Sequence, residues 1–178
     1  MVTSRLRHLI QRGGVSRRYC PRLFLNADRL RGRIPLDPYD AARVANEIRA
    51  QLAAQRESFI FETVLSDPVG EKIGFLKAQA ASGYCVVVCF IGIGSSEISA
   101  ERVAMRVSQG GHDVPLDKLT SRFPRTLANL KLAIRELPAV LVFDNSDLRT
   151  PYRLVAEFSS GTVLFLQEPV PAWLESAM

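Results

Sequence analysis

The chain has 178 residues, 47% of them hydrophobic, which is enough for one domain with its own core. No apolar run approaches the roughly 20 residues that span a membrane, and the start lacks the long apolar segment of a secretory signal. Without the six arginines of residues 1–22, the chain has 17 basic and 18 acidic residues and a net charge of −1. We therefore expect a cytoplasmic protein with no membrane segment.

The excess positive charge lies in the basic head, residues 1–22, which contains no acidic residue. Such a head binds nucleic acid weakly and without specificity. Tyr19 is the only aromatic residue among these arginines, so the head offers no stacking platform for bases. We expect the head to be disordered, and the sequence does not favour a nucleic-acid function.

The three cysteines give no sign of a metal site. They form no CxxC pair and have no histidines at metal-ligand spacing, which argues against structural zinc. We interpret them as core residues and expect no metal site built from cysteine; they are Cys20, Cys85 and Cys89.

The first third of the chain predicts two short strands joined by a helix. LFLNADRL, Leu23 to Leu30, reads as a buried strand that ends on the carboxylate of Asp28. A turn-rich stretch follows, in which Asp37 or Asp40 is expected to cap a long helix. SFIFET, Ser58 to Thr63, then predicts a second strand that also ends on a carboxylate.

The middle of the chain predicts a helix, a buried strand and a second helix. Ser66-Asp67-Pro68 is expected to start the first helix, and Gly83 is a natural stop for it. YCVVVCFI is nearly continuous apolar sequence, which is typical of a strand covered on both faces. Ser95 or Ser96 then caps a helix that runs to about Ser108.

The last third predicts a long helix and three strands. Residues 117–137 carry a helical apolar stripe, which Pro124 should break or kink. AVLVFDNS predicts another buried strand, and RLVAEF and TVLFLQE are expected to pair as a terminal hairpin. The alternation of strands and helices predicts an α/β domain with a mostly parallel sheet flanked by helices.

Five motifs occur in one order with sensible spacing: NAD, FET, RVAMRVSQGGHDVP, SRFPRTLANL and FDNS. Together they resemble the zeta-toxin-like P-loop kinases, in particular the bacterial branch labelled predicted ABC-type ATPase, from about Leu23 to Asp147. The resemblance implies a three-layer P-loop kinase-like domain over residues 23–178 and an ATP-dependent small-molecule kinase that uses ATP and Mg²⁺. It also suggests a UDP-activated amino sugar as the acceptor and an antitoxin protein as a partner.

The resemblance assigns roles to five residues. Asp28 matches the aspartate thought to activate the acceptor hydroxyl, and Glu62 and Thr63 match the segment that contacts the acceptor. The arginines around GGHDVP resemble those that reach the nucleotide phosphates, and we favour Arg106 and Arg122 over Arg102 and Arg125. His112 in the same loop is not expected to be a catalyst.

A P-loop kinase should begin with an apolar strand, the motif GxxxxGK(S/T) and a helix, and this motif does not occur in the 178 residues. We expect the P-loop and the first central strand to be missing, which would leave two neighbouring strands with unpaired backbone groups. The sequence therefore predicts weak ATP binding and little phosphoryl transfer. Two other interpretations stay open: a non-catalytic remnant that acts as an interaction module, and an RNA-binding role of the basic head.

Overall fold

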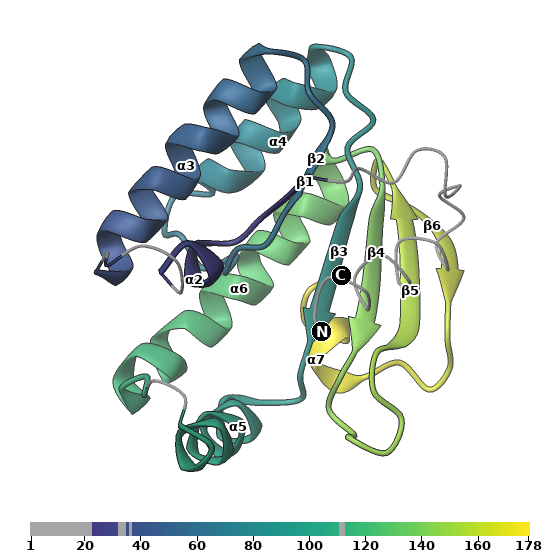
Figure 1. Ribbon diagram of the computed structural model, residues 1–178. Coiled ribbons are helices and arrows are strands. Elements are labelled where there is room, and N and C mark those ends of the chain that lie inside the picture. Colours follow the sequence, from purple (N-terminus) through teal and green to yellow (C-terminus); the bar gives the residue numbers. More distant parts are fainter. Residues whose placement is uncertain (1–22, 32–34, 36, 111–112) are drawn as a thin grey trace. The chain divides into compact units, whose positions relative to one another are not determined.

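The computed structural model describes residues 23–31, 35, 37–110 and 113–178 (Figure 1). The expected disordered head, residues 1–22, lies outside the described residues. The chain divides into two compact units, one that ends at Val64 and one that spans Leu65–Met178. Each unit is described below by itself.

The first unit is a small parallel sheet with two helices. Its elements are β1 (Leu23–Leu25), α2 (Ala27–Arg31), α3 (Pro38–Ala54) and β2 (Phe59–Phe61). β1 and β2 pair in parallel, with Leu23 opposite Phe59 and Leu25 opposite Phe61. The expectation of a buried first strand that ends on Asp28 is wrong, because Leu23 is 48% exposed and Asp28 lies in the first turn of α2. A three-residue strand with one neighbour among the described residues has too little sheet around it to be covered.

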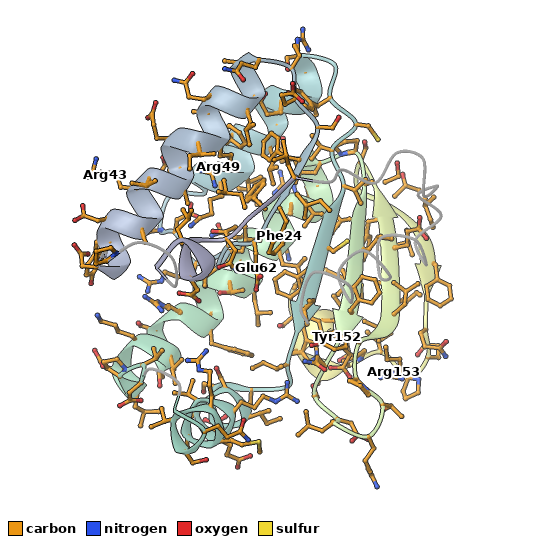
Figure 2. The ribbon with its side chains drawn as sticks, viewed as in Figure 1. Phe24, Arg43, Arg49, Glu62, Tyr152 and Arg153 are labelled. Atoms are coloured by element: carbon orange, nitrogen blue, oxygen red, sulfur yellow. The ribbon has the colours of Figure 1, made fainter. Side chains whose placement is uncertain are left out.

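Helix α3 begins where the sequence places a cap. The side chain of Asp37 accepts hydrogen bonds from the backbone nitrogens of Tyr39 at 2.7 Å and Asp40 at 3.1 Å. Asp37 is therefore the cap, and it satisfies two backbone donors that the first helical turn leaves open. Later in the helix the guanidinium of Arg49, which Figure 2 labels, lies 4.9 Å from the centre of the Phe61 ring. This contact joins α3 to β2.

The second unit is a four-stranded mixed sheet with helices. Its strands are β3 (Val88–Gly92), β4 (Val140–Asp144), β5 (Arg153–Ser159) and β6 (Thr162–Leu166), in the order β3-β4-β5-β6. β3 and β4 are parallel, and the other two pairs are antiparallel. The pairing of β5 with β6 confirms the predicted terminal hairpin. Parallel-containing sheets flanked by helices confirm the predicted α/β class.

Four helices accompany this sheet: α4 (Glu71–Ala81), α5 (Ser96–Ser108), α6 (Leu116–Glu136) and α7 (Ala172–Glu175). The core is built from one side of α6, from β4 and β5, and from α7. Val142 and Phe143 point to opposite faces of β4, and both are 0% exposed, so this strand is covered on both faces. In the described part of the chain, β2 pairs only with β1 and β3 only with β4. The loss of a central strand stays a prediction.

Helix α6 runs without interruption from Leu116 to Glu136 and contains Pro124. The expectation that the helix breaks at Pro124 is wrong, and the alternative, a kink at Pro124, stays a prediction. A proline inside a helix removes one backbone hydrogen bond and costs about 3 kcal/mol. Apolar residues on both sides of Pro124, including Phe123, Leu127 and Leu130, pack on the core and offset that loss.

Over the described residues, no helix combines the length and the apolar character that crossing a membrane would need.

The start of α4 differs from the sequence prediction, whereas the start of α5 agrees with it. α4 begins at Glu71 rather than at residues 66–68, because Gly70 before it has a positive φ of 70° that does not continue a helix. Val69 therefore lies outside the helix and is 85% exposed. α5 begins at Ser96, where the Ser95 hydroxyl accepts a hydrogen bond from the backbone nitrogen of Ile98 at 3.4 Å.

Candidate functional site

The motifs NAD and FET meet in the first unit. Asn26 directly follows β1 and Glu62 directly follows β2, and the carboxyl ends of parallel strands lie at one edge of a sheet. The amide nitrogen Nδ2 of Asn26 donates to Oε2 of Glu62 at 2.8 Å, and the backbone nitrogen of Glu62 donates to the carbonyl of Leu25 at 3.0 Å. Asn26 was not among the predicted site residues, although its position as the first polar residue after β1 was an available signal.

The predicted acceptor residues lie at the surface of the first unit. Asp28 is exposed in the first turn of α2, and Thr63 is exposed beside Glu62. Two carboxylates and a hydroxyl group provide hydrogen-bond acceptors and a donor for a polar small molecule. Figure 2 shows Glu62 next to β1 and β2. The roles of Asp28, Glu62 and Thr63 stay predictions.

In the second unit, the carboxylate of Asp144 joins the end of β4 to β5 and α7. Its Oδ1 accepts from the backbone nitrogen of Ser146 at 3.1 Å, from the Ser146 hydroxyl at 2.6 Å and from Nε1 of Trp173 at 3.3 Å. Its Oδ2 lies 3.4 Å from Nη2 of Arg153. Burial raises the pKa of Asp144, but the hydrogen bonds from Ser146, Trp173 and Arg153 outweigh burial, and the net pKa is below its ordinary value.

The lowered pKa predicts how the stability of an Asp144→Asn variant depends on pH. A carboxyl whose pKa is lowered by folding stabilises the protein above its unfolded pKa, and this contribution is lost as the pH falls through the folded pKa. We expect Asp144→Asn to lose about 1–3 kcal/mol at pH 7. The difference from wild type should shrink below about pH 4, the ordinary pKa of an aspartate. Urea unfolding midpoints between pH 7 and pH 3 measure it, and a difference that stays constant would contradict the assignment.

The predicted nucleotide arginines lie on α5 and α6 of the second unit. Nη2 of Arg102 donates to the backbone carbonyls of Asn145 and Ser146, with 3.2 Å to Ser146. Arg106 lies one turn further along α5 and is exposed. On α6, Arg122 is half-buried, and Nη2 of Arg125 lies 3.4 Å from the hydroxyl of Ser121.

The predicted site residues thus fall into two groups. Asp28, Glu62 and Thr63 belong to the first unit, and Arg106 and Arg122 belong to the second. His112, which we did not expect to be a catalyst, lies outside the described residues.

Over the described residues, no three or more His, Cys, Asp or Glu side chains come together in a group that could hold a metal ion. Mg²⁺ in phosphoryl-transfer sites is usually held by one or two protein ligands together with the substrate phosphates. Mg²⁺ therefore stays a cofactor implied by the family resemblance.

Comparison with known proteins identifies one family. A family model described as zeta toxin matches residues 38–153, about 65% of the chain. The matched range begins at the first residue of α3 and ends at the first residue of β5, so it includes Glu62, Arg106 and Arg122 and leaves Asp28 outside. No curated protein matches the chain. No solved structure matches it either.

Proposed function

Because the chain belongs to the zeta toxin family, we propose that it is a kinase-like, nucleotide-binding protein built on the plan of an ATP-dependent small-molecule kinase. The observation that carries the proposal is the family match over residues 38–153, which contains four of the five predicted site residues. Those four are Glu62, Thr63, Arg106 and Arg122.

The first unit supplies the acceptor side of this proposed function. The hydrogen bond from Asn26 fixes one oxygen of the Glu62 carboxylate, so the orientation of the other oxygen is set before an acceptor arrives. Thr63 adds a hydroxyl, and Asp28 is the base that would receive the proton of the acceptor hydroxyl. A UDP-activated amino sugar, with several hydroxyl groups, has the chemistry that such a set of acceptors would bind.

The second unit supplies the cationic side. Arg106 and Arg122 would place planar guanidinium groups against phosphate oxygens, where charge develops during phosphoryl transfer. Any antitoxin partner belongs to the proposal as well, since the family name alone suggests it.

The proposed kinase is impaired as the 178-residue polypeptide. The sequence contains no GxxxxGK(S/T), so it lacks the loop whose backbone N–H groups surround the phosphates and the lysine that reaches the β and γ phosphates. Two arginines on helices do not replace such a loop, because their flexible side chains must be ordered when the ligand binds. If no phosphoryl transfer remains at all, the chain would be a non-catalytic interaction module.

Titration calorimetry with ADP and ATP tests the nucleotide site. We expect wild type to bind with a Kd of about 1 mM, and Arg106→Ala and Arg122→Ala each to weaken binding further by about tenfold. Arg43→Ala is the matched control, because Arg43 is an exposed helix arginine paired with Asp40 at 3.1 Å in the first unit (Figure 2). Unchanged affinity in both Arg106→Ala and Arg122→Ala would overturn the assignment of the site.

A further inference from the structure

The loop after β4 is held by hydrogen bonds from three directions in the second unit. The backbone nitrogen of Asn145 donates to the carbonyl of Gly92 at the end of β3, at 2.8 Å. The Ser146 hydroxyl donates to Asp144 at 2.6 Å. The guanidinium of Arg102 donates to the carbonyls of both Asn145 and Ser146. These hydrogen bonds therefore hold the loop in place, and Arg102 attaches helix α5 to it.

Helix α5 has little apolar attachment of its own. None of its thirteen residues is buried, whereas α6 buries residues such as Leu130 and Ile134 in the core. In most helices of globular proteins, packing of an apolar face supplies the stability. In α5, the charge-assisted hydrogen bonds of Arg102 replace part of that packing, and each such bond is stronger than one between neutral groups.

The loop before α5 also packs closely on the loop after β4. A Cβ atom added at Gly94 would lie 3.2 Å from Cδ1 of Ile98 and 3.4 Å from the Ser146 hydroxyl. Ser95 caps the helix through its hydroxyl. The first turn of α5 is therefore held by short-range contacts, and Arg102, near the middle of the helix, adds a second attachment to the same loop.

We propose that Arg102 is a positioning residue: it ties α5 to the loop formed by Asn145 and Ser146 and so sets where Arg106 is presented. Arg102 and Arg106 are four residues apart, so they lie on one face, about 6 Å apart along the helix axis. This inference rests on the proposed function for the role of Arg106. It gives Arg102 a structural contact, because the N–H groups on its Nη2 are used on backbone carbonyls.

The test uses the full chain and two readouts. Hydrogen exchange of backbone amides, without nucleotide, reports the attachment of α5, and ADP affinity reports the use of Arg106. We expect Arg102→Ala to raise exchange over residues 96–108 and 145–147 by about tenfold or more and to weaken ADP binding to the level of Arg106→Ala. Arg102→Lys should fall between, because lysine keeps a charged donor but its shorter side chain does not place that donor where Nη2 lies.

Arg106→Ala is the control for the exchange readout. It should weaken ADP binding and leave exchange over residues 145–147 unchanged. Slow exchange over Val140–Phe143 in every variant shows that the core is intact. If Arg102→Ala does not keep this slow exchange, the inference is judged from Arg102→Lys alone.

Normal exchange over residues 96–108 in both Arg102 variants overturns the inference. If wild type shows no ADP binding, the proposed nucleotide site fails. Faster exchange in the Arg102 variants would still support the attachment of α5, so the two failures are distinguishable.

Discussion

Replacing Gly92 by alanine is expected to destabilise the second unit by about 3 kcal/mol, as overpacking of a filled core does. An added Cβ would lie 2.2 Å from Cη2 and 2.5 Å from Cζ2 of the Trp173 ring. The ring has no room to move, because it is only 6% exposed, donates to Asp144 at 3.3 Å and lies 6.0 Å from the ring centre of Phe90. Guanidinium unfolding, followed by circular dichroism, measures the loss.

Two further variants separate this clash from the general effect of adding a methyl group. Gly74 lies inside α4 with no atom within 4 Å of an added Cβ, so Gly74→Ala should stabilise by about 0.5–1 kcal/mol. In a Trp173→Ala background, Gly92→Ala should cost less than about 1 kcal/mol, because the atoms that it meets are gone. Additive losses in the double variant would show that the ring is not the cause.

Removing the side chain of Asn129 is expected to cost about 2–4 kcal/mol, since it leaves two backbone carbonyls without their donor. Asn129 lies on α6 and is 7% exposed. Its Nδ2 donates to the carbonyls of Leu65 at 3.2 Å and Asp67 at 2.9 Å. These bonds fix the segment before α4, which also holds the ion pair of Asp67 with Lys72 at 3.5 Å.

The comparison of Asn129→Ala with Asn129→Asp tests the hydrogen bonds rather than the packing. Asn129→Asp keeps the shape, but an ionised carboxylate cannot donate and would face two carbonyl oxygens. We expect it to be at least as destabilising as Asn129→Ala at pH 7 and to recover partly at acidic pH, where the protonated group donates one bond. Urea unfolding at pH 7 and pH 4 measures both, and losses below about 0.5 kcal/mol in both variants would contradict this account.

Local chemistry made part of the fold predictable. Asp37 and Ser95 cap helices because a side-chain oxygen reaches backbone donors two or three residues away, which is visible in any short stretch of sequence. The apolar run that ends in Asp144 likewise predicts a covered strand, because a continuous apolar stretch is also visible in a short piece of sequence. The half-exposed β1 and the unbroken α6 were not predictable, because they depend on how many neighbours an element has and on how much packing offsets Pro124.

The motifs of the candidate site could be predicted from the sequence, but the hydrogen bonds between its distant residues could not. Five motifs in order identified the family that the match over residues 38–153 shows. The bond from Asn26 to Glu62 joins residues 36 positions apart, and that from Arg102 to Asn145 joins residues 43 apart. No periodicity or cap signal encodes such pairs, so only the folded chain shows that Arg102 acts on the backbone.

The central claim is that the chain carries the acceptor and arginine elements of a small-molecule kinase without the phosphate-binding loop. Transfer of the γ phosphate from ATP to a UDP-activated amino sugar, measured with Mg²⁺ and the purified 178-residue chain, tests it most directly. We predict a rate at least about a thousandfold below the roughly 1–100 per second of typical kinases, since the sequence does not contain GxxxxGK(S/T), the motif whose backbone donors and lysine stabilise the transferring phosphate. Transfer at an ordinary kinase rate would contradict the account.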